Sequence, residues 1–297
     1  MTILWLFFLL QAAHAGKITE EENLKLKKRC SKFAVAPNVY KRYRENQLKY
    51  PFVFATSWTD NGSHSPPLCS GVLISSRHIL TAAHCLVMDE KETCKQRSAL
   101  QETPAQNVGV FQSSCSTEEC WMGKDVAKVA VVHKHQNFDV DEFCDKRTTY
   151  DMGMIELEQD IPDFKPICMP QEHDIIPQRL ISIGYGNYSN DYSIKAVVYE
   201  SVNEDPDMKD TLLAYTNRRN ESTLHGDSGG PLLQVRGGKY YLVGITSKST
   251  KPPAKEFVGY FVDVRKKLKW ICDETGVCPL TDSGESKKPP SEEEESS

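Results

Sequence analysis

The sequence predicts an all-β fold of the barrel type, and three features support this. Gly237 and Gly238 separate two apolar runs, which is a strong hairpin signal. Helical patterning is confined to a short stretch near the N-terminus and to residues 265–274. Short apolar runs recur between turn residues at 51–55, 71–74, 78–81, 126–132, 180–186, 232–235, 240–243 and 258–264. Many short strands with few helices are typical of β-barrels.

Residues 1–15 predict a secretory signal peptide. Residues 3–10 form an unbroken apolar run, and the small residues Ala13 and Ala15 precede Gly16 like a cleavage site. The run is too short for a membrane span, which needs about 20 apolar residues. We therefore expect a secreted, extracellular protein without a membrane anchor.

Residues 16–45 are charged, lack strand alternation and are expected to form a pro-segment. Thr19 and Glu22 have the spacing of a helix capping box, which predicts a short helix. A basic cluster follows, made of Lys25, Lys27, Lys28, Arg29 and Lys32. We interpret this cluster as a solvated helix face, with a proteolytic processing site as the alternative.

Three separated motifs carry residues suited to nucleophilic catalysis. Residues 226–230 are Gly-Asp-Ser-Gly-Gly, and glycines let a backbone approach a substrate and turn N–H groups toward an oxyanion. His84 follows an apolar strand pattern, and Asp151 stands at the head of another. Each motif alone also fits a surface turn, a packed histidine or a turn carboxylate. All three together are a stronger signal.

The order of the motifs separates two hydrolase classes. The match of residues 226–230 to G-x-S-x-G raises an α/β-hydrolase, in which the order is Ser, acid, His. No histidine follows Ser228, so the order here is His84, Asp151, Ser228. The three motifs in this order resemble the trypsin and chymotrypsin family of serine proteases, roughly from residue 50 to 275. The opening at 17–23 also resembles the divergent trypsin-like group of nematodes.

The resemblance implies two six-stranded antiparallel β-barrels with the site between them and a closing C-terminal helix. It implies a serine endopeptidase that acts on protein or peptide substrates, without a cofactor or metal. His84 would take the proton of Ser228, and Asp151 would hold the imidazole in position. The N–H groups of Gly226 and Ser228 would bind the oxyanion. By family position, Ser247 would support Asp151.

The substrate-binding residues implied by the resemblance are Ser222, Ser249 and Gly259. Ser222 stands where trypsin-like members carry an aspartate, so the S1 pocket is uncharged and a basic side chain would lack a counter-charge. We expect a chymotrypsin-like preference for apolar or aromatic residues, with Gly259 leaving room at the base. Leu224 replaces a disulfide cysteine, and Lys248 replaces the tryptophan of the cleft wall.

Asp227 occupies the position of the zymogen switch. In active relatives, cleavage after a basic residue releases an N-terminal ammonium that pairs with this carboxylate. No Ile-Val-Gly-Gly is present, so the partner of Asp227 and any activating protease stay unidentified. These departures support an alternative hypothesis, a catalytically silent protease-fold protein that binds or regulates a partner.

The ten cysteines predict disulfides, because an even number in a secreted chain is typical of them. No paired C-x-x-C spacing indicates zinc. The resemblance implies bridges Cys69–Cys85 and Cys30–Cys168, the second tethering the pro-segment. The pairing of the other six stays open: Cys94, Cys115, Cys120, Cys144, Cys272 and Cys278.

Two further segments, residues 90–124 and the C-terminal tail, lack the residue patterns that predict strands or helices. Residues 90–124 show no clear strand and predict a long disulfide-held loop. This loop lies inside the expected protease domain, which would span 46–278.

Residues 279–297 are acidic, cannot build a core and are expected to be disordered. This tail holds most of the net charge of −5, which leaves the folded body near neutral. We therefore expect neither nucleic-acid nor membrane binding. We also expect a monomer. Asn61, Asn187 and Asn220 head glycosylation sequons.

Overall fold

The structure is a computed structural model that describes most of the expected protease domain and part of residues 16–45, the expected pro-segment. The described residues are 16–31, 43–44, 49–60, 63–64, 68–87, 103–112, 126–145, 149–186, 193–216, 222–250 and 257–279. The expected signal peptide, the asparagines of the three glycosylation sequons, three of the cysteines (Cys94, Cys115 and Cys120) and residues 280–297 of the tail lie outside them. No helix within the described ranges has the length and apolar character needed to span a bilayer.

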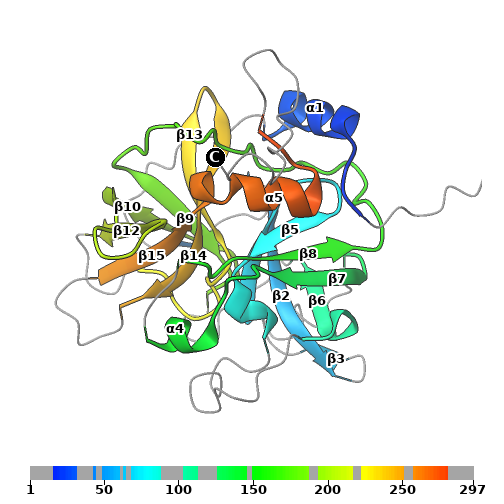
Figure 1. The fold of residues 1–297 in the computed structure, drawn as a ribbon, viewed down its shortest axis with the longest axis horizontal. Coiled ribbons are helices and arrows are strands. Elements are labelled where there is room, and N and C mark those ends of the chain that lie inside the picture. The colour runs from blue at the N-terminus through cyan, green and yellow to red at the C-terminus, as the bar shows by residue number, and fades with distance from the viewer. Residues whose placement is uncertain are drawn as a thin grey trace, which may run out of the picture.

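Two antiparallel sheets form the fold (Figure 1). The first has the order β3 (Ser63–His64), β2 (Val53–Asp60), β4 (Cys69–Leu73), β5 (His78–Thr81), β8 (Gly153–Leu157) and β7 (Val129–Lys134), with β6 (Val108–Phe111) also paired to β2. The second has the order β1 (Tyr43–Arg44), β10 (Lys195–Tyr199), β9 (Leu180–Gly184), β13 (Pro231–Arg236), β14 (Lys239–Ser249), β15 (Phe257–Asp263), β12 (Thr211–Thr216) and β11 (Ser201–Glu204).

The all-β class and the double-barrel arrangement are confirmed, because both sheets curl into half-barrels. The described strands number seven and eight in the two sheets instead of six. The additional strands are the two-residue β1 and β3 and the edge strand β11. These short strands widen the sheets at their edges and leave the arrangement of the central strands unchanged.

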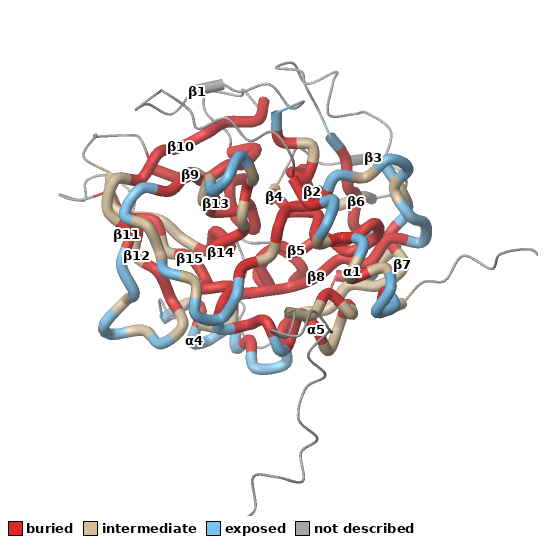
Figure 2. The backbone as a smooth tube through the Cα atoms, turned by 90° about the horizontal axis from the view of Figure 1, so that it is seen from above, coloured by how far each residue is buried: buried red, intermediate tan, exposed pale blue. Residues whose placement is uncertain are grey.

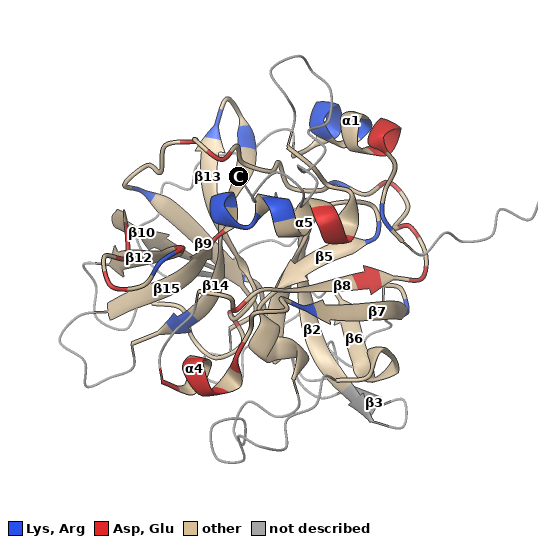
Figure 3. Cartoon of the chain, in the orientation of Figure 1, with Lys and Arg blue, Asp and Glu red and all other residues tan. Residues whose placement is uncertain are grey.

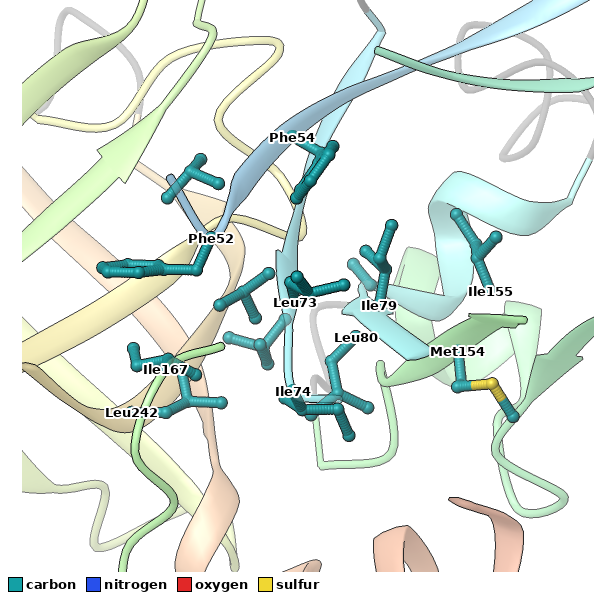
Figure 4. Close-up of a cluster of buried hydrophobic side chains, with 14 of the residues drawn as sticks. Phe52, Phe54, Leu73, Ile74, Ile79, Leu80, Met154, Ile155, Ile167 and Leu242 are labelled. Carbon is teal, nitrogen blue, oxygen red and sulfur yellow. The ribbon is translucent and has the colours of Figure 1, made fainter. Parts of the chain in front are cut away.

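The largest buried cluster contains residues from strands of both sheets, and a second cluster lies within the second sheet. Most central strand positions are buried along the tube in Figure 2, and β4, β5 and β8 are buried at every position. Figure 4 shows Leu242 of β14 beside Ile167, and both belong to the same buried cluster as Leu73 and Ile74. Strands buried on both faces are fixed by packing. The described residues next to these strand ends, such as His84 after β5 and Asp151 before β8, are therefore held in defined positions.

Two strand predictions have different outcomes. The hairpin between β13 and β14 is present, and Gly237 and Gly238 have φ of +56° and +70°, the positive values that a tight hairpin turn requires. The expectation of no strand in residues 90–124 was wrong, because β6 lies there and pairs with β2. Val108, Val110 and Phe111 are buried. Four residues interrupted by Gly109 were too short a pattern to stand out.

The predicted N-terminal helix is α1 (Glu20–Arg29), and it begins with the capping box of Thr19 and Glu22. The segment packs on the body, since Ile18 N donates to Thr275 O of α5 (Leu268–Thr275) at 2.8 Å. The interpretation of the basic cluster as a solvated face was wrong at Lys27. Its Nζ is buried, with no hydrogen-bond partner in the described part of the chain, and burial lowers the pKa of Lys27 to about 8.

Three disulfides join pairs of cysteines that both lie in the described residues. The structure contains the Cys69–Cys85 and Cys30–Cys168 bridges that the resemblance implies. It also joins Cys272 to Cys278, just after α5. Ser31 N donates to Pro166 O at 2.9 Å beside the Cys30 bridge. The N-terminal segment that contains α1 is thus attached to the body by a covalent bond and by backbone hydrogen bonds.

Candidate active site

Neighbouring strand ends bring His84 and Asp151 together. β5 and β8 pair with Thr81 opposite Gly153. The short helix η2 (Ala83–Leu86) follows β5 and carries His84, while Asp151 lies just before β8. Gly153 permits this approach, because a Cβ there would lie 2.6 Å from Leu86. The two side chains therefore meet between elements that both belong to the first sheet.

Three hydrogen bonds tie His84, Asp151 and Ser247 into one buried network. His84 Nδ1 lies 2.8 Å from Asp151 Oδ2, and His84 N donates to Asp151 Oδ1 at 2.9 Å. Ser247 Oγ of β14 donates to Asp151 Oδ2 at 2.5 Å. His84 and Asp151 are each 1% exposed. Both oxygens of the carboxylate are thus used to fix the imidazole.

The electrostatics of this network favour an ionised Asp151. Burial alone would raise the pKa of Asp151, but the charge of His84 and the hydrogen bonds from His84 and Ser247 bring it below its ordinary value. An ionised carboxylate accepts the Nδ1 proton of His84. This leaves Nε2 as the nitrogen that can accept another proton.

The loop of residues 226–230 packs against the segment that leads to His84. Gly226 and Gly229 have φ of +95° and +80°, values that favour glycine. A Cβ on Gly229 would lie 2.1 Å from Thr81 Oγ1. Ser70 N donates to Ser228 O at 2.7 Å. Since Ser70 follows Cys69, which is bonded to the neighbour of His84, the loop of Ser228 is held close to the histidine.

The side chain of Ser228 and two nearby N–H groups are not engaged by described residues. Within those residues, the Ser228 hydroxyl makes no hydrogen bond to His84, so this link of the expected triad is open. The N–H groups of Gly226 and Ser228 likewise have no acceptor in the described chain. Catalytic hydrogen bonds are often long before a substrate binds.

Asp227 has partners that the sequence did not identify. Its Oδ1 accepts from Gly186 N at 2.8 Å, and its Oδ2 accepts from Leu224 N at 2.7 Å. Asp227 is buried. Hydrogen bonds from N–H groups stabilise a buried carboxylate. Leu224, at the position of the missing disulfide cysteine, contributes one of them through its backbone.

An aromatic ring that sequence analysis did not single out covers His84. Phe143 belongs to the acidic helix α4 (Val140–Cys144), visible in Figure 3. Its ring stacks on the imidazole with centroids 4.8 Å apart and planes at 22°. Lys248 Nζ lies 3.7 Å from the Phe143 centroid and donates to Phe143 O. Lys248, expected only to remove an apolar wall, thus connects the second sheet to α4.

The residues expected to form the substrate slot lie around Thr223. Ser249 Oγ donates to Thr223 O at 2.8 Å, and Tyr199 Oη accepts from Thr223 N at 3.1 Å. The expected room at Gly259 is filled, because a Cβ there would lie 2.7 Å from Tyr199 Oη and 2.7 Å from Phe261. Sequence analysis missed Tyr199 and Thr223. Tyr199 lies in a strand that the sequence did not predict.

One group of potential metal ligands occurs among the described residues, namely Cys69, His84 and Cys85. The two cysteines form a disulfide, so they offer no thiolate to a metal. The donor set therefore does not fit a metal site.

Comparison with known proteins decides the family. The family model described as trypsin matches residues 40–271. The chain belongs to the trypsin family. The resemblance inferred from the three motifs is thereby confirmed, while the subgroup of nematodes remains a prediction.

The curated relatives of this trypsin-family chain include two named as serine proteases and one named as an enzyme. Spermosin of Halocynthia roretzi is 27% identical over 76% of the chain, and CLIP domain-containing serine protease B15 of Anopheles gambiae is 24% identical over 82%. Proclotting enzyme of Tachypleus tridentatus is 25% identical over 69%. The matches span 59%, 71% and 58% of those proteins, respectively.

Proposed function

We propose that this trypsin-family chain is a secreted serine endopeptidase that hydrolyses peptide bonds in proteins or peptides. The observation that supports it most is the buried network of His84, Asp151 and Ser247, with its hydrogen bonds of 2.5–2.9 Å. A histidine that only packs at a strand end would not need such a carboxylate. Both oxygens of Asp151 accept hydrogen bonds from His84, and one of them also accepts from Ser247. The Ser228 loop lies next to this network.

In the proposed reaction, Ser228 Oγ attacks the substrate carbonyl while His84 Nε2 takes its proton. His84 then returns a proton to the leaving amine, and water repeats the sequence on the acyl-enzyme. Asp151 keeps the Nδ1 proton in place and stabilises the charged imidazolium. Because Ser228 is not hydrogen-bonded to His84 in the described structure, rotation of its hydroxyl toward Nε2 is part of the proposed binding step.

The N–H groups of Gly226 and Ser228 are proposed to bind the oxyanion. Both lie on the loop that Asp227 and Ser70 hold. Fixed donors of this kind contribute about 10²–10³ in rate. The bonds of Asp227 to Gly186 and Leu224 support this loop without the N-terminal ammonium used by active relatives.

Ser222 gives the proposed S1 pocket an uncharged character. A lysine or arginine side chain of the substrate would lose its hydration there without gaining a carboxylate. The hydroxyls of Ser222 and Ser249 and the backbone of Gly259 would line the pocket. We therefore propose that cleavage does not follow basic residues.

We propose that residues 1–15 are removed and the chain is secreted. The secreted chain carries N-linked glycans at Asn61, Asn187 and Asn220, and an activating protease cuts it within 16–45. Cleavage after Cys30 would leave residues 16–30 attached, because Cys30 is bonded to Cys168. We propose a domain over 46–278, a disordered tail at 279–297 and a monomeric state.

A second candidate function is a protease-fold protein that has lost turnover and binds a partner. The open link between Ser228 and His84 among described residues favours it. So does Lys248, which connects β14 to α4 beside His84.

Hydrolysis of fluorescein-labelled casein tests the proposal. The purified chain beginning at Gly16 is assayed before and after limited proteolysis, with Ser228→Ala as the matched control. The proposal expects hydrolysis that Ser228→Ala abolishes. Equal hydrolysis by both proteins, or none by a folded wild-type chain in either form, would favour the binding function.

A further inference from the structure

The segment around Thr223 and the end of β14 face each other across the proposed S1 pocket. Ser249 Oγ on β14 donates to Thr223 O at 2.8 Å, so the two walls are joined directly at this point. Ser222 Oγ donates to the same carbonyl at 3.3 Å. Carbon atoms in contact lie about 3.5–4.0 Å apart, so an aromatic ring between two walls needs about 7 Å. The joined atoms leave no such space.

The far end of the pocket is closed by two fixed rings. Tyr199 Oη accepts from Thr223 N at 3.1 Å and donates to Thr223 Oγ1 at 3.4 Å. The Tyr199 and Phe261 rings pack edge to face, with centroids 5.5 Å apart. Both rings are 0% exposed. Space beside Gly259 that a side chain of the substrate would enter is taken by these two rings.

We propose that Ser249 and Tyr199 determine specificity by closing this pocket, so that the enzyme cleaves after small uncharged residues such as glycine, alanine or serine. This inference rests on the proposed peptidase function of the same site. It replaces the aromatic preference expected from the sequence. That expectation depended on an empty space at Gly259, which Tyr199 and Phe261 occupy.

Ser249 and Tyr199 differ in how easily each can be displaced from the pocket. Ser249 is partly exposed at the end of β14, and its bond is one hydroxyl contact. Tyr199 is in the core of the second sheet, with Leu180, Val197 and Phe261 in the same cluster. Packed cores resist displacement. Removal of the Ser249 side chain should therefore open the entrance, while the base at Tyr199 stays closed.

The test measures labelling of Ser228 by three phosphonate probes. A fluorophosphonate without a peptide side chain reports whether the nucleophile reacts. Two peptide diphenyl phosphonates that differ only in alanine or phenylalanine at the position before the phosphorus report the pocket. The proteins are the wild type, Ser249→Gly, Tyr199→Phe and the control Ser201→Gly at the start of β11, a serine two residues after Tyr199 whose hydroxyl donates to Gln178 Oε1 and not to Thr223.

The proposal expects the alanine probe to label wild type about 100-fold faster than the phenylalanine probe, a ratio typical of a pocket that rejects a large group. Ser249→Gly should shift that ratio toward phenylalanine by about tenfold, and Ser201→Gly should not shift it. Tyr199→Phe keeps the ring, so it should retain the alanine preference. Fluorophosphonate labelling together with a phenylalanine preference in wild type would overturn the pocket inference alone. Absence of all labelling would overturn the proposed function and this inference with it.

Discussion

His84 and Asp151 lie in a different kind of environment from Ser228. The first two are held by short hydrogen bonds among buried side chains, and a stacked ring covers the imidazole. Ser228 lies on a glycine loop held by backbone hydrogen bonds, and its hydroxyl has no hydrogen-bond partner among the described residues. The first arrangement is built from strand ends of a packed sheet. The second depends on a turn and on the carboxylate of Asp227.

This difference indicates which substitutions should impair the network of His84 and Asp151 and which should impair the loop of Ser228. Side-chain networks fail when one partner is removed, because the others stay buried without a partner. A loop held through its backbone tolerates side-chain changes but depends on the groups that fix its shape. Four substitutions test this difference between the two halves of the site.

Asp151→Asn should have the largest effect, because it removes the charge that holds the Nδ1 proton of His84. We expect kcat to fall by about 10⁴, with the fold unchanged. The measurement is hydrolysis of a peptide with alanine before the scissile bond. A loss of less than tenfold would show that Asp151 does not serve His84.

Asp227→Asn tests the loop half. The amide has one acceptor oxygen, so its nitrogen would face the N–H of either Gly186 or Leu224. We expect the rate to fall by about 10² through displaced oxyanion donors. The same peptide assay measures it, with the exposed Asp207→Asn as control. Unchanged activity would mean that the loop keeps its shape without this carboxylate.

Ser247→Ala removes one of three bonds to Asp151 and leaves the two from His84. We expect kcat to fall about tenfold, or about 1.4 kcal/mol, with KM unchanged. This effect should be far smaller than that of Asp151→Asn. A loss as large as that of Asp151→Asn would mean that Ser247 holds the carboxylate more strongly than His84 does.

His78 probes the packing of the first sheet through pH. Burial, followed by the charge of Arg77, lowers the pKa of His78 to about 3 from an ordinary 6.5. The unfolded chain thus binds this proton first as pH falls. The free energy of unfolding should therefore drop from about pH 6.5 toward pH 3, by up to about 1.4 kcal/mol per unit. His78→Asn should flatten this slope in urea titrations, whereas the exposed His173→Asn should not.

The sequence predicted the parts of the site that depend on local motifs. His84, Asp151 and Ser228 each stand in a short pattern with its own physical reason, and family membership and the double-barrel class followed from their order. Contacts between distant segments were not predictable. Tyr199 lies 24 residues from Thr223 along the chain, and nothing in the pattern around it indicates a pocket. Phe143 is likewise an ordinary aromatic residue until the fold places it on His84.

Fluorophosphonate labelling of the folded chain that begins at Gly16, read by mass spectrometry, is the most direct test of whether His84, Asp151 and Ser228 act together. We predict modification of Ser228 that is lost in His84→Ala and sharply slowed in Asp151→Asn. Failure of wild type to label before and after limited proteolysis would contradict it, as would labelling that His84→Ala leaves unchanged.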